Sequence, residues 1–275
     1  MGIQELLFLA SVPVILLCLY VYSKDAVKEP KKLLTKLFVW GVISIIPILV
    51  LEIAVNTFVD ADKVSNQIVK LIATFVGIGL IEEGAKWIIT YKVVYNSKEF
   101  NHAYDAIVYA VFVSLGFALI ENIFYVFGRG ALTGVLRAFT TIPSHACDGI
   151  IMGYFLGLAK QEEYNSNQEE SDKNMFMSLL IPIIAHTLYD YFIISGSDIL
   201  LYVFIAFTVA MYIICFKLIN KISKLNCNFD GKHFSEETIK PENNVSSTNS
   251  FKYAFSRTLL FSLLLLIIGG IILYI

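Results

Sequence analysis

Residues Tyr104–Tyr125 read YDAIVYAVFVSLGFALIENIFY, and this stretch decides the fold. From Ala106 to Ile120 it contains no charged residue, and a helix needs about 20 mostly apolar residues to cross a bilayer. Backbone polar groups in lipid must pair within the protein, which leaves only helices and closed barrels. The stretch is too long and too continuous for a barrel strand, so it predicts a transmembrane helix.

Other stretches of similar length and hydropathy lie on both sides of it. The hydrophobic fraction is 57% and the charged fraction is 16%, whereas a soluble domain carries about 25% charged residues because its surface faces water. We therefore predict an all-α protein, a polytopic transmembrane helix bundle of about eight spans. The predicted spans are residues 2–23, 35–56, 67–93, 104–127, 135–159, 175–195, 198–219 and 254–275.

Lysine and arginine predict the orientation, because cytoplasmic loops carry an excess of both. If the N-terminus lies outside, sixteen of the 21 lie in cytoplasmic loops and only Lys63, Lys70, Arg129 and Arg137 in outer ones. We therefore predict a multi-pass protein of the cell membrane with both termini extracytoplasmic. The polar segment 221–253 is then a flexible cytoplasmic loop. It separates a membrane-embedded core, residues 1–220, from a C-terminal transmembrane helix, residues 254–275.

Composition argues against other classes of protein. The net charge is −2 and no basic patch is present, so we expect no nucleic-acid partner. The four cysteines have no CxxC spacing, so neither a disulfide framework nor a zinc knuckle is expected. The lipid bilayer is the partner that the composition indicates.

Several predicted spans carry ionisable residues away from their ends. A charged side chain at the bilayer centre costs about 2.5–3.5 kcal/mol on insertion scales, so such residues face the bundle interior and often mark a functional site. Glu82 and Lys86 are four residues apart, as are His186 and Asp190, so each pair shares a helix face. The remaining candidates are Glu83, Glu121 in a stripe with Phe117 and Tyr125, and His145 with Asp148.

Two prolines lie next to the histidines. Pro143 precedes His145 by two residues, and Pro182 lies one turn before His186. A proline inside a helix removes a backbone hydrogen bond and bends the helix. We therefore expect a bend that opens polar space beside each histidine.

Each feature also has a purely structural explanation. Glu82 and Lys86 could simply neutralise each other, and Glu121 could hydrogen-bond a carbonyl while protonated. His186 and Asp190 could form a packing hydrogen bond. The adjacent glutamates, Glu82 and Glu83, are harder to explain, because packing alone seldom requires two carboxylates side by side in a membrane.

The same positions resemble the PrsW family of membrane proteases, distant relatives of the type II CAAX prenyl endopeptidases. The resemblance covers about residues 10–195, in order and in spacing, and the motif helices span 67–195 of the proposed protease core. The matching segments are EEGAKW at Glu82–Trp87, the stretch Tyr104–Tyr125, PSHACDGIIMGYFLG at Pro143–Gly157 and HTLYD at His186–Asp190.

The resemblance implies an intramembrane protease that makes the first (site-1) cut in a single-span anti-sigma factor, on its extracytoplasmic side. The cut would release a sigma factor for a stress or antimicrobial-peptide response. The two adjacent glutamates of the family match Glu82 and Glu83, and its later motif histidine matches His186. His145 and Glu121 match other motif positions. The prenyl endopeptidases have a histidine where this chain has Glu121.

We hypothesise that Glu82 or Glu83 is the general base for an activated water, with Lys86 setting which of them stays ionised. His186, oriented by Asp190, is then the oxyanion donor or the general acid. The predicted catalytic set is Glu82, Glu83, Glu121, His145, His186 and Asp190, supported by Lys86, Phe117, Tyr125 and Asp148.

This scheme needs no cofactor, but a Zn²⁺ site is a close alternative. His145, His186, Glu121 and Asp190 offer nitrogen and oxygen donors suited to zinc, although no HExxH motif is present. Two other functions remain open. A proton- or cation-coupled transporter could use the same residues, although no internal repeat is visible, and a non-catalytic scaffold could hold a substrate helix.

Overall fold

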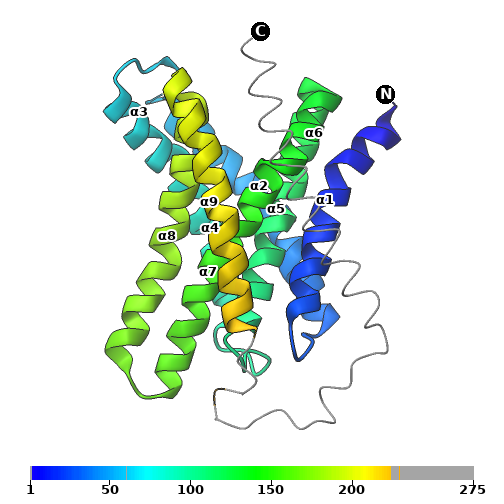
Figure 1. Ribbon diagram of the computed structural model, residues 1–275, viewed down its shortest axis with the longest axis vertical. Coiled ribbons are helices and arrows are strands. Elements are labelled where there is room, and N and C mark those ends of the chain that lie inside the picture. Colours follow the sequence, from blue (N-terminus) through cyan, green and yellow to red (C-terminus); the bar gives the residue numbers. More distant parts are fainter. Residues whose placement is uncertain (1, 60, 224–228, 230–275) are drawn as a thin grey trace.

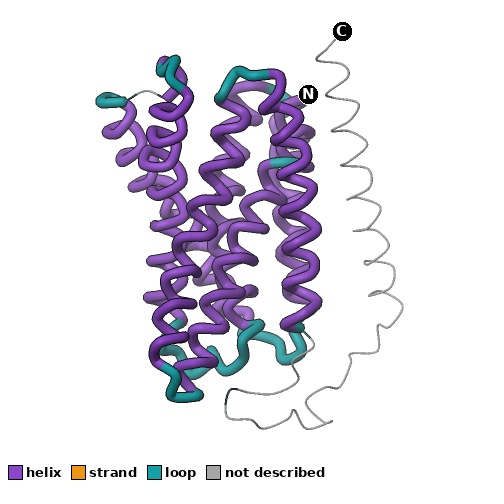
Figure 2. The backbone as a smooth tube through the Cα atoms, turned by 60° about the vertical axis from the view of Figure 1, so that its left-hand side comes forward, coloured by secondary structure: helices purple, strands orange, loops and turns teal. Residues whose placement is uncertain are grey.

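The computed structural model describes residues 2–59, 61–223 and 229, and this part of the chain is helical, with no strand. The helices run side by side in one bundle (Figures 1 and 2). The all-α prediction is confirmed for these residues. The elements are α1 Ile3–Lys24, α2 Lys31–Asn56, the 3₁₀ turn η1 Ala61–Lys63, α3 Gln67–Thr74, the π-helical turn η2 Phe75–Gly79, α4 Leu80–Val94, α5 Asp105–Arg129, α6 Ala131–Phe139, α7 Thr141–Tyr164, α8 Gln168–Ile194 and α9 Asp198–Ile222.

Helix α5 is the centre of the bundle and corresponds to the stretch that predicted the fold. It packs against α1, α2 and α7, and α7 packs in turn against α8 and α9. Every residue from Asp105 to Val111 is buried. A Cβ on Gly153 of α7 would collide with the backbone of Ala106 and Ile107, so glycine is what lets these two helices approach closely.

The predicted span 67–93 is one helical run with an irregular middle, formed by α3, η2 and α4. A Cβ on Gly79, the last residue of η2, would collide with Thr187 of α8. The missing side chain therefore allows a close approach to α8. Single π-helical turns are rare in proteins, and those that occur often lie near functional sites. Here the turn ends one residue before α4, the helix of Glu82 and Glu83.

The predicted span 135–159 is wrong at its start. The chain turns at Thr140, so α6 and α7 are separate helices. The bend expected at Pro143 is also wrong. Pro143 lies in the first turn of α7, where a backbone N–H has no partner within the helix and proline costs nothing. Pro182 does lie inside α8.

The count of about eight spans is not confirmed. Five of the described helices, α1, α2, α5, α8 and α9, are long and apolar enough to cross a membrane. Helix α4 has 15 residues, which is short for a span, and α7 carries several polar residues between Ser144 and Asp148. The predicted span 254–275 and nearly all of the predicted loop 221–253 lie outside the described residues.

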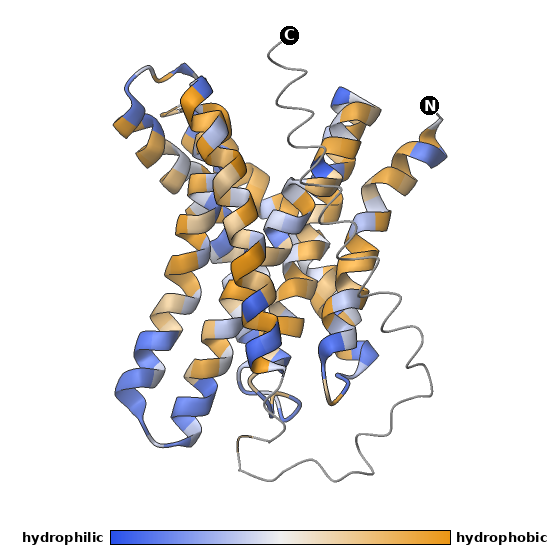
Figure 3. Cartoon of the chain, viewed as in Figure 1, coloured by the Kyte–Doolittle hydropathy of each residue, from blue (hydrophilic) through white to orange (hydrophobic). Residues whose placement is uncertain are grey.

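The outer surface of the described helices is apolar where lipid would contact it. Ile46 and Val50 of α2 are 66% and 62% exposed, and such large exposed apolar side chains are rarely gathered on a soluble surface. Hydrophilic residues collect at the ends of the bundle, as Figure 3 shows. Together with the five apolar helices, this pattern is that of a membrane protein.

Candidate functional site

Lys86 of α4 lies at the centre of a buried cluster of ionisable residues. Its Nζ donates to Glu82 Oε2 at 3.0 Å and to Glu83 Oε1 at 2.7 Å, and its side chain is fully buried. The same ammonium lies 3.3 Å from His145 Nδ1 and 4.2 Å from the centre of the Phe117 ring. A buried charge without a partner is strongly destabilising, and here two carboxylates and an aromatic face provide the compensation.

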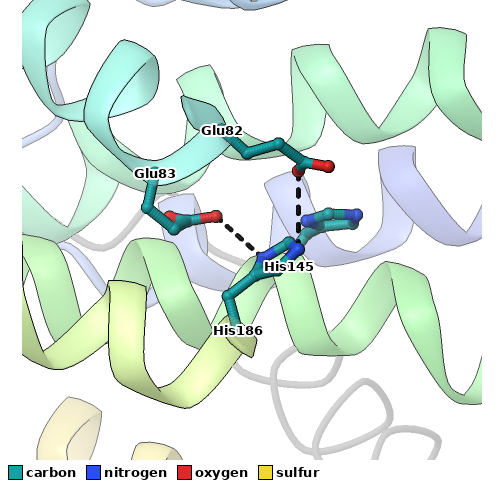
Figure 4. Close-up of side chains that lie close together, drawn as sticks. All are labelled: Glu82, Glu83, His145 and His186. Atoms are coloured by element: carbon teal, nitrogen blue, oxygen red, sulfur yellow. Dashed lines mark ion pairs between the residues drawn. The ribbon is translucent and has the colours of Figure 1, made fainter. Parts of the chain in front are cut away.

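His186 of α8 connects α4 with α7. Its Nδ1 lies 3.0 Å from Glu83 Oε1 and 3.2 Å from Asp148 Oδ2. Its Nε2 lies 3.2 Å from Asp190 Oδ2 and 3.6 Å from Glu82 Oε2. Figure 4 shows the two glutamates reaching the imidazole ring from one side. Carboxylates only accept hydrogen bonds, so this is the geometry of an imidazolium that donates from both nitrogens.

His145 of α7 extends the cluster toward α5 and α6. Because the Lys86 ammonium can only donate, His145 Nδ1 accepts from it and His145 Nε2 carries the proton. That Nε2 lies 2.8 Å from Glu121 Oε2, which also forms an ion pair with Arg137 Nη2 at 2.7 Å. The guanidinium of Arg137 lies 4.0 Å from the centre of the Tyr125 ring. Glu121 is therefore held by a hydrogen bond with His145 and by an ion pair with Arg137.

A cavity of about 840 Å³ lies against this cluster. Its lining includes Asn56, Arg129 and Ile194, the last residues of α2, α5 and α8. The cavity thus extends from the cluster to the end of the bundle at which these helices end. Glu82 lines the cavity and its side chain is 8% exposed, whereas the Glu83 side chain is fully buried. Of the two adjacent glutamates, only Glu82 is reachable from the cavity.

The structure brings every residue singled out in the sequence to this one centre. The Glu82 and Glu83 carboxylates lie 3.6 Å and 3.0 Å from His186 nitrogens, although the residues come from different helices. The grouping follows from the geometry, while the catalytic roles stay predictions. Among the residues predicted from the sequence, those that line the cavity are Glu82, Phe117, Glu121, Tyr125, His145, His186 and Asp190, and those that lie behind them are Glu83, Lys86 and Asp148.

Two residues of the site were missed in the sequence. Arg137 was counted only as a basic residue of the outer side, yet it pairs with Glu121. Glu52 of α2 lines the cavity, and its Oε1 is buried with no hydrogen-bond partner among the described residues. Glu52 lies inside the predicted span 35–56, so its ionisable side chain was a signal. Neither residue has a partner at helical spacing, because their neighbours lie on other helices.

The donors of the cluster fit a metal ion. One atom each from Glu82, Glu83, His145 and His186 lie within 4.8 Å of one another, and two imidazoles with carboxylates are typical zinc ligands. The two histidines belong to the predicted set, but Glu121 and Asp190 each bond one histidine instead. The Lys86 ammonium lies within 3.3 Å of atoms of Glu82, Glu83 and His145, so a metal ion held by these donors would have to displace it.

Comparison with known proteins gives one family. Residues 29–217 match the sequence model of the PrsW family intramembrane metalloproteases. A protein named protease PrsW from Oceanobacillus iheyensis is 36% identical over 202 residues, which cover 74% of this chain and 88% of the relative. The protease PrsW of Halalkalibacterium halodurans is 32% identical over 77% of this chain and 93% of the relative. That of Bacillus subtilis is 33% identical over 68% and 81%. No solved structure matches the chain.

Proposed function

Because the chain belongs to the PrsW family of intramembrane metalloproteases and is therefore a membrane peptidase, we propose that it cleaves a single-span membrane protein in the cavity described above. One observation carries the proposal. Glu82 and His186 lie 3.6 Å apart, and both line a cavity of about 840 Å³ that reaches one end of the bundle. A base and a proton donor thus lie together where an extended substrate segment can enter.

Glu82 is our choice for the general base. A general base must reach the water it activates, and Glu82 lines the cavity while Glu83 does not. As the water oxygen bonds to the carbonyl carbon of the scissile peptide, Glu82 takes the water proton. Glu83 lies behind Glu82 and pairs with Lys86 and His186. Lys86 holds both carboxylates in place through its ion pairs.

His186 is our choice for the general acid. Asp148 and Asp190 hold its two nitrogens from opposite sides of the ring, which fixes the ring and favours its protonated form. When the tetrahedral intermediate breaks its C–N bond, the leaving amine needs a proton, and His186 lies next to the base that received one. His145, Glu121 and Arg137 are positioning residues, since they hold the α5–α7 side of the cavity together.

Metal-dependent hydrolysis is the second candidate, and the donor set of the cluster favours it. Glu82, Glu83, His145 and His186 are the residues that would hold the ion. A bound divalent metal supplies Lewis acidity, which polarises a peptide carbonyl or lowers the pKa of a bound water. The two candidates differ in one measurable property. Exhaustive chelation leaves the glutamate-dependent enzyme active and inactivates the metal-dependent one until Zn²⁺ is returned.

We propose a single-span anti-sigma factor as the substrate, cut on its extracytoplasmic side as the first (site-1) step. The support is the sequence resemblance, together with the cavity that reaches the end of the bundle where α2, α5 and α8 end. With both termini extracytoplasmic, as the lysine and arginine pattern favours, that end faces outward. An N-terminal epitope that is accessible in intact cells would support the orientation, and one accessible only after permeabilisation would contradict it.

Co-reconstitution in lipid vesicles tests the proposal. Purified full-length protein is combined with a candidate single-span anti-sigma factor, and its cleavage products are identified by mass spectrometry. We expect cleavage by the wild type and none by Glu82→Gln or His186→Ala. Glu169→Gln, an exposed carboxylate on α8, is the matched control and should cleave normally. Cleavage that persists in both site variants would overturn the assignment.

If the candidate substrate stays intact with the wild type and with every variant, a second measurement is needed. Membrane proteins that accumulate in cells carrying Glu82→Gln, compared with cells carrying Glu169→Gln, identify the natural substrate. An anti-sigma factor among them supports the finer proposal, and its absence contradicts it. Family membership already favours a peptidase over the transporter and the scaffold.

A further inference from the structure

A second buried cluster of carboxylates lies at the other end of α5. Asp25 follows the last residue of α1, Glu29 lies in the connection to α2, and Asp105 is the first residue of α5. Asp105 and Glu121 are 16 residues apart on α5, or about 24 Å at 1.5 Å per residue. In Figure 1 this end lies below, where α1 ends, away from the N-terminus. The cluster is therefore separate from the candidate active site.

The three carboxylates are close together and almost completely buried. One oxygen from each lies within 4.8 Å of the others. The exposed fractions are 6% for Asp25, 4% for Glu29 and 0% for Asp105. Three buried carboxylates without compensation repel one another and lose their hydration, which is unfavourable unless a positive charge or protons are supplied.

Hydrogen bonds from the protein satisfy only part of the cluster. Asp105 Oδ2 accepts from the backbone N–H groups of Asn101 and His102 at 3.0 Å and 2.8 Å. Glu29 Oε2 accepts from the Tyr109 hydroxyl. One oxygen each of Asp25 and Asp105, Oδ2 and Oδ1, is buried with no hydrogen-bond partner among the described residues. Buried acceptors of this kind are rare and indicate an unseen water or ion.

The basic side chains next to the cluster compensate its charge only in part. Lys28 donates to the backbone oxygens of Tyr22, Ser23 and Asp25 at 2.7, 3.2 and 2.6 Å, so its three protons are used. Its charge still acts on Asp25 through space. His102 Nδ1 lies 3.5 Å from Asp105 Oδ2. Within the described part of the chain, no lysine or arginine forms a salt bridge with the three carboxylates.

Burial raises the pKa of Asp25 to about 7 and that of Glu29 to about 9, and repulsion from Asp105 adds to both shifts. The neighbouring charges that act on these two groups are Asp105, Lys28 and Glu99. These shifts reflect repulsion and lost hydration within the cluster, and a bound cation would relieve both.

We propose that Asp25, Glu29 and Asp105 bind a hard divalent cation of the class of Mg²⁺, Ca²⁺ or Mn²⁺. The donors are all oxygens, and carboxylate oxygen selects these ions over softer metals. Oxygens that bind one Ca²⁺ ion lie at most about 4.6–5.2 Å apart, twice the usual bond length. One oxygen from each of the three carboxylates lies within 4.8 Å of the others, so a single ion can contact all three. The ion ties the α1–α2 connection to the first turn of α5, and the inference does not depend on the proposed protease mechanism.

Counting bound Mn²⁺ tests the site. Full-length protein in detergent is freed of metal by chelation and titrated with MnCl₂, and free Mn²⁺ is measured by electron paramagnetic resonance. We expect Asp105→Asn to bind one Mn²⁺ fewer per chain than the wild type, or to bind it at least tenfold more weakly. The Asn carbonyl keeps an acceptor for the two backbone N–H groups. Glu169→Gln, which removes an exposed carboxylate, should match the wild type.

Any Mn²⁺ bound at the Glu82 cluster is common to these proteins, so it cancels in the difference. We also expect MgCl₂ or CaCl₂ to displace the Mn²⁺ and to raise the melting temperature of the wild type more than that of Asp105→Asn. If Asp105→Asn does not fold, Asp25→Asn is compared instead. Equal Mn²⁺ stoichiometry and affinity in the wild type and in the folded variant would overturn the proposal.

Discussion

The two carboxylate clusters toward the two ends of α5 are neutralised in different ways. In the orientation proposed above, the cluster around Lys86 is the outer one, and the cluster of Asp25, Glu29 and Asp105 is the inner one. At the outer cluster, Lys86 reaches both Glu82 and Glu83, and Arg137 reaches Glu121. At the inner cluster, Lys28 donates its hydrogen bonds to backbone oxygens, and one buried oxygen each of Asp25 and Asp105 has no hydrogen-bond partner among the described residues. The two clusters show that buried carboxylates can be compensated by cationic side chains to different extents, and on our proposal a divalent cation supplies the rest at Asp25, Glu29 and Asp105.

The two clusters also differ in whether a substrate can reach them. The outer cluster lies against a cavity of about 840 Å³, so its groups can meet a substrate while the chain's own cations hold them in place. The inner cluster is almost fully buried between the α1–α2 connection and α5. We expect its charge to act on stability and on the position of α5, and not on substrate.

The largest effect should come from Glu82→Gln. The amide cannot take a proton from water, and loss of a general base typically costs 10²–10⁴-fold in rate, or about 3–5 kcal/mol of transition-state stabilisation. The measurement is the initial cleavage rate of a single-span substrate in vesicles. Asp105→Asn in saturating MgCl₂ should retain the rate within a few-fold. Equal losses in the two variants would remove the distinction between the clusters.

Lys86→Met should be the most destabilising substitution. It leaves Glu82 and Glu83 buried without their shared ammonium, and breaking a buried ion pair on one side costs about 3–5 kcal/mol. Unfolding of the purified protein, followed by tryptophan fluorescence, measures the loss. Adding Glu83→Gln to Lys86→Met should recover part of it, because one uncompensated charge is then gone. A double variant no more stable than Lys86→Met would show that Lys86 acts through packing.

Arg137→Met should lower the cleavage rate about tenfold, equivalent to about 1.4 kcal/mol, because Glu121 then holds His145 without its ion-pair partner. We expect Arg137→Lys to retain most of the activity, since a lysine can still reach the Glu121 carboxylate. The comparison of the two variants at saturating substrate is the measurement. Identical losses would point to the guanidinium stacked on Tyr125 as the important contact.

Asp25→Asn should give the smallest effect, and in the absence of a metal ion it should increase the stability of the protein instead of lowering it. In excess chelator at pH 7, the variant should be more stable than the wild type. The amide carries neither the buried charge nor the cost of protonating a carboxyl group whose pKa burial raises to about 7. In MgCl₂ the order should reverse, since the variant has lost a ligand. Thermal unfolding in the two buffers tests this crossover. A variant less stable in both would contradict the idea of an inner cluster left open for a cation.

Helix positions were predictable where apolar residues were continuous, as at Tyr104–Tyr125. The start of α7 was not, because Thr140 interrupts the helix between two apolar stretches. The ionisable residues of the candidate site were predictable for one reason. Each is costly in lipid and had no local compensation other than the pairs at helical spacing. Glu52 and Arg137 were missed because neither has a partner at helical spacing; Arg137 pairs with Glu121 of another helix.

The sequence by itself determined the class of fold, most of the apolar helical segments and most of the acids and histidines that must turn away from lipid, because hydropathy and helical period are local properties. Only the tertiary structure decided which of them meet. It placed Glu82 at the cavity and Glu83 behind it, and it brought Asp105 beside Asp25 and Glu29. Contacts between helices depend on which glycine faces allow close packing, as at Gly79 and Gly153, and no spacing along one helix contains that information.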